Sequence, residues 1–196
     1  MLRYHATTAL VVVDVQNDFA DPAGSLSVAG GEAVIGRIND EIAMATTAGA
    51  LVVFTQDWHP TSTPHFAKDG GPWPVHCVAD TWGAALHPDL AAPDDAPRIH
   101  KGANGEDGYS GFTMRDPTTG DEQPTELDQL LRDRGIERVV VVGLATDYCV
   151  KATALDAVRL GFSVSMLAEA MAAVNLAPED GDRALGEMLE AGVTTG

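Results

Sequence analysis

Residues 139–157 read VVVVGLATDYCVKATALDA and join two kinds of pattern. The first four residues are a continuous run of β-branched side chains, which is typical of a strand buried on both faces of a parallel sheet. From Asp147 to Leu160 apolar residues recur with the spacing of one helix face, and Gly161 predicts the end of that helix. A buried strand that leads directly into a helix is the repeating unit of an α/β fold.

The same alternation continues along the rest of the chain. Three more apolar runs predict strands at residues 10–13, 51–54 and 162–167, and a shorter strand is expected near residues 98–100. Helical periodicity covers residues 32–48 and recurs around residues 127–131 and 185–189. We therefore predict a three-layer αβα fold with a mostly parallel, Rossmann-like central sheet, in a single domain over residues 1–196.

Composition restricts the partners of this chain. Its 12 basic and 29 acidic residues give a formal net charge of −17, which argues against binding to a phosphate backbone. No stretch approaches the roughly 20 apolar residues that span a bilayer, and the run at residues 9–13 is too short for a signal peptide. Two cysteines make no disulfide framework. We expect a cytoplasmic protein with no nucleic-acid or membrane partner, and homo-oligomerisation stays open.

Two chemically active side chains follow predicted strands. Asp14 ends the run at residues 10–13, and Cys149 follows the run at residues 139–142. Right-handed crossovers make these strands neighbours at the edge where α/β sheets bind ligands, so the two side chains should face each other. Thr146 is a natural helix N-cap, and the helix N-terminus would lower the pKa of Cys149. By position alone, Cys149 fits a nucleophile and a small core residue equally well.

The segment 57–123 interrupts the alternation and is rich in Gly, Pro, His and Trp. A loop region this long inside a compact domain is usually functional, and we expect it to build a pocket. Asp57 and His59 are two apart on an extended segment, so their side chains point the same way, and His65 and His76 follow. One carboxylate with two or three imidazoles predicts a catalytic metal site. The alternative is a histidine-rich loop that packs against prolines and tryptophans.

The chain carries four motifs in the order DVQNDF (14–19), DWHP with WPVHCV (57–60 and 73–78), HKG (100–102) and GLATDYCV (143–150). Together they resemble the nicotinamidases of the isochorismatase-like cysteine hydrolases. The resemblance implies hydrolysis of nicotinamide to nicotinic acid and ammonia through a cysteine thioester, with pyrazinamide as a further substrate. It also implies a role in NAD salvage.

The resemblance assigns catalytic roles. Asp14, Lys101 and Cys149 match the family's triad of proton acceptor, orienting cation and nucleophile. In the family the peptide bond before Ala145 is cis, which would direct the N–H groups of Ala145 and Cys149 at the oxyanion.

The resemblance also assigns the metal and the substrate pocket. The matched metal ligands are Asp57, His59 and His76, with His65 matching a histidine that ligates in some members only. The cofactor would be one divalent metal ion, with zinc as the first choice and iron or manganese as alternatives. Phe19 and Trp73 match the aromatic walls around a pyridine ring.

The sequence also leaves alternative functions open. A different cysteine amidohydrolase of the same fold, for instance one acting on carbamoyl compounds, is the nearest alternative, although the metal-free branches lack the histidine cluster. Isochorismatases proper do not need a cysteine at this position, so Cys149 argues against that activity. A non-enzymatic metal-binding module would keep its binding activity when Cys149 is replaced. Tyr109 and Tyr148 receive no role, and we expect Cys77 and His87 to be structural.

Overall fold

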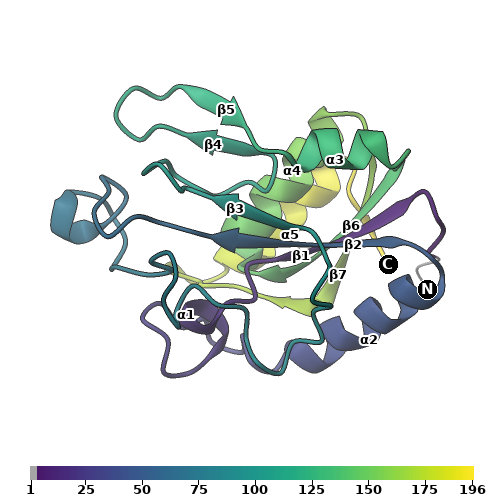
Figure 1. Cartoon of the computed structure of the whole chain (residues 1–196), viewed down its shortest axis with the longest axis horizontal. Helices are drawn as coiled ribbons and strands as arrows, with labels where there is room; N and C mark the ends of the chain where they lie inside the picture. Colours follow the sequence, from purple (N-terminus) through teal and green to yellow (C-terminus); the bar gives the residue numbers. More distant parts are fainter. Residues whose placement is uncertain (1–3) are drawn as a thin grey trace.

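The computed structural model describes residues 4–196 as three layers around one parallel sheet (Figure 1). The sheet has the order β3-β2-β1-β6-β7-β8, and all its strand pairs are parallel. Its strands are β1 (Thr8–Val13), β2 (Leu51–Asp57), β3 (Arg98–Lys101), β6 (Arg138–Leu144), β7 (Ser163–Ala172) and β8 (Thr194–Thr195). The predicted α/β fold class is confirmed.

Helices cover both faces of the sheet. They are α1 (Asn17–Ala20), α2 (Ile35–Thr47), α3 (Leu127–Asp133), α4 (Lys151–Arg159) and α5 (Asp180–Glu190). In Figure 1, α2 lies on one side of the sheet and α3, α4 and α5 lie on the other. A small antiparallel hairpin, β4 (Thr113–Arg115) with β5 (Glu122–Pro124), stands apart from the main sheet. Among the described residues, no helix is long and apolar enough to cross a bilayer.

Strand β1 shows why the apolar runs are continuous. Alternate side chains of a strand point to opposite faces, and Leu10 and Val12 join the core under α2. Val11 and Val13 join the second core, which also contains Ala154 of α4. Both faces of β1 are therefore buried, as the sequence pattern predicted.

Several boundaries differ from the prediction. Helix α2 begins at Ile35, three residues later than expected, and β7 continues to Ala172 instead of ending at 167. In α5 the predicted apolar stripe is narrower, because Met188 is buried whereas Leu189 is 48% exposed. The helix packs through Met188 and Ala184, which are one turn apart.

The strands that carry the site meet at one edge. Val13 at the end of β1 lies beside Thr55 of β2 and beside Gly143 of β6. Gly143 has a φ of +113°, and a Cβ added there would lie 2.1 Å from the Val13 carbonyl oxygen. Glycine at this position therefore allows β1 and β6 to stay paired up to the edge where Asp14 and the GLATDYCV motif begin.

Candidate active site

A fully buried lysine joins two aspartates at the carboxyl ends of three strands. Lys101 ends β3, and its Nζ lies 2.6 Å from Asp14 Oδ2 and 2.8 Å from Asp57 Oδ1. Nζ also donates a hydrogen bond to the Gly108 carbonyl. The register of β2 with β3 places Asp57 directly beside Lys101. Because a buried charge needs close partners, the lysine and the two carboxylates form one electrostatic unit.

Asp14 is held in an unusual backbone conformation. Its φ is +48°, in the left-handed region, which costs a non-glycine residue on the order of 1–3 kcal/mol. Thr55 Oγ1 donates to Asp14 Oδ1 at 2.6 Å, while Lys101 donates to Oδ2, also at 2.6 Å. These two bonds fix the orientation of the Asp14 carboxylate.

Cys149 lies opposite Asp14, as the topology predicted. It belongs to a π-helical turn (Thr146–Val150) that precedes α4. Its Sγ and one carboxylate oxygen each of Asp14 and Asp57 all lie within 4.8 Å of one another. The prediction that Thr146 caps the helix is wrong, because the extended cap residue is Ala145 and Thr146 is already inside the turn. The Leu144–Ala145 peptide bond is cis, as the resemblance implied.

The protonation of Cys149 differs from the expectation. Burial raises the pKa of the thiol well above its ordinary value, and the Asp14 and Asp57 carboxylates raise it further against the opposing effect of Lys101. The predicted lowering of this pKa by the helix N-terminus is therefore wrong, because loss of solvation and two nearby anions outweigh it. A protonated resting thiol needs an adjacent base before it can attack.

The two aspartates have opposite pKa shifts. Burial raises the pKa of Asp14, although Lys101 lowers it in part. Burial would also raise the pKa of Asp57, but Lys101 and the neighbouring histidines hold it well below its usual range. Asp57 therefore stays ionised, while Asp14 takes up a proton more readily. Such a divergence of two adjacent carboxyl groups is typical of acid–base sites.

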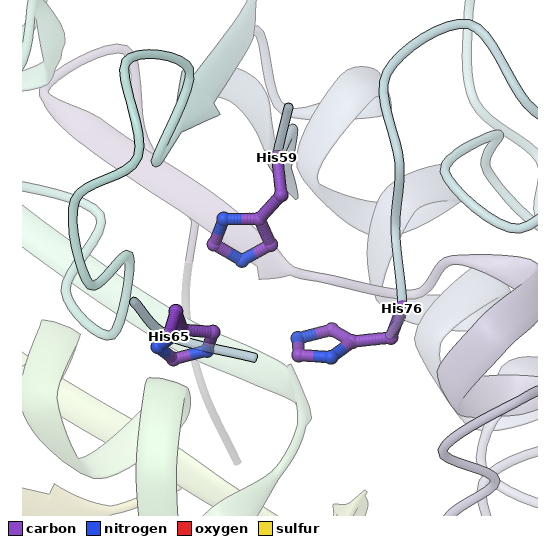
Figure 2. Close-up of side chains that lie close together, drawn as sticks. All are labelled: His59, His65 and His76. Atoms are coloured by element: carbon purple, nitrogen blue, oxygen red, sulfur yellow. The ribbon is translucent and has the colours of Figure 1, made fainter. Parts of the chain in front are cut away.

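Three buried histidines gather next to this pair. One ring nitrogen each of His59, His65 and His76 lies within 4.8 Å of the others, and Figure 2 shows the three rings around a common space. Asp57 Oδ2 lies 3.7 Å from His59 Nε2 and 3.8 Å from His76 Nε2. The structure thus brings together all four residues that the sequence suggested as metal ligands.

Hydrogen bonding shows that this cluster fits a metal ion. His76 Nδ1 donates to the Pro74 carbonyl at 2.7 Å, which leaves its Nε2 with a lone pair. Within residues 4–196, both ring nitrogens of His59 are buried without a hydrogen-bond partner. Asp57 Oδ1 has only the ion pair with Lys101, without hydrogen-bond geometry. Unsatisfied buried polar atoms are costly. A divalent cation among one carboxylate and three imidazoles would satisfy His59 Nε2, the ring nitrogen that lies on the side of Asp57 and the cluster.

Replacement of His59 tests the cluster. We expect His59→Ala to lose most of its bound metal, because one of four ligands is removed, while the chain stays folded. Metal content measured after gel filtration checks this. His87→Ala is the matched control, since His87 is equally buried but pairs with Asp21, with its Nε2 3.9 Å from Oδ2. Wild-type metal content in His59→Ala would remove His59 from the ligand set.

A pocket opens above Cys149 and the histidines. Its empty volume is about 430 Å³, which includes its opening to solvent. Both aromatic residues predicted from the sequence, Phe19 and Trp73, line it. Trp73 Nε1 donates to the Tyr109 hydroxyl at 2.8 Å, and the Tyr148 ring lies edge-on to Trp73 at 4.9 Å between centroids. The two tyrosines without a predicted role are therefore part of the pocket wall.

Some residues of the site were not found from the sequence. The Gln16 amide Nε2 donates to the Asp57 carbonyl at 2.8 Å, and its Oε1 accepts from the Asp57 N–H at the same distance. Gln16 lies inside the DVQNDF motif, so that motif could have drawn attention to it. Leu26, Val28 and Val174 line the pocket from segments that carry no motif. As expected, Cys77 belongs to the hydrophobic core.

Fold and site together define a metal-containing hydrolase of the α/β class. The family model described as "Isochorismatase domain" matches residues 8–195, so the chain belongs to the isochorismatase family. A nicotinamidase of Escherichia coli (strain K12) is 41% identical over 202 residues, covering 95% of this chain and 92% of that protein.

Solved structures agree with this assignment. A pyrazinamidase of Pyrococcus horikoshii in complex with zinc superposes with a TM-score of 0.87 at 41% identity, covering 97% of this chain and 98% of the other. PnC1 from L. infantum in complex with nicotinate gives a TM-score of 0.87 at 38% identity, covering 99% and 94% of the two chains.

Proposed function

We propose that this chain hydrolyses nicotinamide to nicotinic acid and ammonia through a thioester on Cys149. The single observation that carries the proposal is the position of Cys149, in a pocket between the buried Asp14–Lys101 pair and the histidine cluster. Pyrazinamide is an isosteric ring amide and should enter the same pocket. The relatives named above support both substrates.

In the first half of the reaction, Cys149 Sγ attacks the amide carbon. Asp14 takes the thiol proton during attack, because the resting thiol is protonated and the raised pKa of Asp14 suits a proton acceptor. The N–H groups of Ala145 and Cys149 donate to the oxyanion. Asp14 then gives its proton to the leaving nitrogen, the C–N bond breaks, and ammonia departs while the acyl group stays on Cys149 as a thioester. Lys101 keeps Asp14 ionised before attack and offsets its charge.

In the second half, water attacks the thioester carbon. Asp14 accepts a proton from that water and returns one to the leaving Cys149 sulfur, which releases nicotinic acid and restores the thiol. Asp57, His59, His76 and His65 would hold a divalent cation, with zinc first and iron or manganese as alternatives. When bound, this cation supplies a Lewis-acid position for the ring nitrogen of the substrate. Phe19 and Trp73 would enclose the ring.

Metal removal tests the proposal as a whole. We expect purified protein to release ammonia from nicotinamide, to lose this activity after treatment with a chelator, and to recover it when zinc is added back. Ammonia release is measured in all three states, with iron and manganese as parallel additions. Release from other amides but not from nicotinamide would instead indicate another cysteine amidohydrolase. Absence of release from every amide would favour a non-enzymatic metal-binding module.

We also infer that the chain acts as one domain, in the cytoplasm and without a nucleic-acid partner. The net charge of −17 supports the absence of nucleic acid. A reducing compartment is supported by the two cysteines, Cys77 and Cys149, which are both free in the described part of the chain.

A further inference from the structure

Three consecutive residues contact three different parts of the site. Asp107 Oδ1 lies 2.6 Å from His65 Nδ1, and the Gly108 carbonyl accepts a hydrogen bond from Lys101. The Tyr109 hydroxyl accepts one from Trp73. The first of these contacts concerns a residue that no motif pointed to. We propose that Asp107 is a positioning residue that fixes His65 as the fourth ligand of the metal site. This inference rests on the metal site of the proposed function.

The contact determines which His65 nitrogen is free. A carboxylate only accepts hydrogen bonds, so His65 Nδ1 carries the proton and donates it to Asp107. His65 Nε2 is then left with the lone pair that a metal needs. A carboxylate behind a ligating imidazole also fixes the orientation of the ring and raises its basicity as a ligand.

His65 has the strongest such support in the cluster. His76 donates to a neutral peptide carbonyl, and within residues 4–196 the ring nitrogens of His59 have no hydrogen-bond partner. The side chains of His65 and Asp107 are only 3% and 15% exposed, so solvent screens their interaction little. Among the three histidines, His65 is therefore the one that Asp107 contacts directly.

Hydrogen bonds to the backbone hold the segments of both partners independently of this contact. The Asp107 N–H donates to the Arg115 carbonyl at 2.7 Å, and the Arg115 N–H donates back at 3.1 Å, which ties Asp107 to β4. On the other side, Thr63 Oγ1 accepts from the His65 N–H at 3.2 Å and donates to the Gly105 carbonyl at 2.7 Å. Substitution of the Asp107 side chain should thus leave the loop in place.

The test measures metal affinity, which needs no turnover. Asp107→Ala, Asp107→Asn and wild type are compared by chelator competition and by the ligand-field absorption spectrum of the cobalt(II)-substituted proteins. We expect Asp107→Ala to lower metal affinity by about 10–100-fold and to change the cobalt spectrum. Asp107→Asn keeps an acceptor oxygen without the charge, so its loss should be intermediate.

Glu106→Gln is the matched control. It removes the same charge from the adjacent position, but the Glu106 carboxylate accepts from the Asn104 N–H at 2.9 Å instead of contacting the histidines. We expect its metal affinity and cobalt spectrum to equal those of wild type.

A double-variant cycle separates action through His65 from a general effect of the loop. In a His65→Ala background, Asp107→Ala should cause no further loss of affinity. An equal loss in both backgrounds, unchanged affinity in Asp107→Ala, or wild-type affinity in His65→Ala would each overturn the inference. A wild type that binds no metal would overturn it together with the metal site. A wild type whose metal affinity depends on His65 and Asp107 but that releases no ammonia would contradict only the proposed function.

Discussion

Replacement of Cys149 by alanine is expected to lower kcat for nicotinamide hydrolysis by about 10⁴-fold or more. The reason is that Sγ is the nucleophile on which both halves of the proposed reaction depend, while the remaining groups keep substrate binding and a small residual rate. Metal content and thermal stability should stay near those of wild type, because the substitution only shortens a small buried side chain. Ammonia release, metal analysis and thermal unfolding of the purified variant check these expectations.

The second cysteine provides the control for this experiment. Cys77 is fully buried in the hydrophobic core, beside the predicted ligand His76. Cys77→Ala should keep most of its turnover and lose some stability, since it removes a core side chain. If Cys149→Ala kept a tenth of wild-type activity, the nucleophile would have to be another group.

Of the substitutions proposed for the active site, Lys101→Met should cause the largest loss of unfolding free energy. Methionine has a similar length but no charge, so Asp14 and Asp57 would face each other in the interior without the ammonium group that contacts both. Removal of one partner from a buried ion pair typically costs about 3–5 kcal/mol of unfolding free energy. Turnover should fall by about 10³-fold, because Asp14 would then be protonated before attack.

The pH dependence of the Lys101→Met variant has a definite sign. Lys101 lowers the pKa of both Asp14 and Asp57, so its removal raises both values in the folded state. A carboxyl group whose pKa is higher in the folded than in the unfolded chain lowers the free energy of unfolding at pH values above its unfolded pKa. This loss disappears as the pH falls below the unfolded pKa, because the group is then protonated in both states. Urea unfolding should therefore show a large deficit near pH 8 and a smaller one near pH 5. An equal deficit at both values would contradict the shared-lysine arrangement.

Topology was readable from the sequence because its signals are local or follow simple rules. The continuous apolar runs predicted β1 and β6 as buried strands, and the crossover rule made them neighbours with Asp14 opposite Cys149. The protonation of Cys149 was not readable, because it depends on how much solvent the folded chain excludes and on how close Asp57 lies. Both quantities exist only after distant segments have packed together.

Contacts within the long loop were the least accessible from the sequence. Asp107 reaches His65 across a separation of 42 residues, and no periodicity or spacing rule connects them. The register of β3 beside β2, which puts Lys101 next to Asp57, is likewise set by pairing between segments far apart in the chain. Motifs identified the reactive side chains, whereas their supporting partners required the three-dimensional structure.

The connection from the end of β2 at Asp57 to the start of β3 at Arg98 carries one part of the site, and the sheet carries the other. Residues 58–97 supply the three histidines and Trp73, whereas Asp14, Lys101 and Cys149 stand on or beside the sheet. Insertions and deletions are tolerated far better in a surface connection than inside paired strands. Evolution could therefore change the ring preference of this chain through substitutions, insertions or deletions in this one connection. The residues that break the amide bond would stay unchanged.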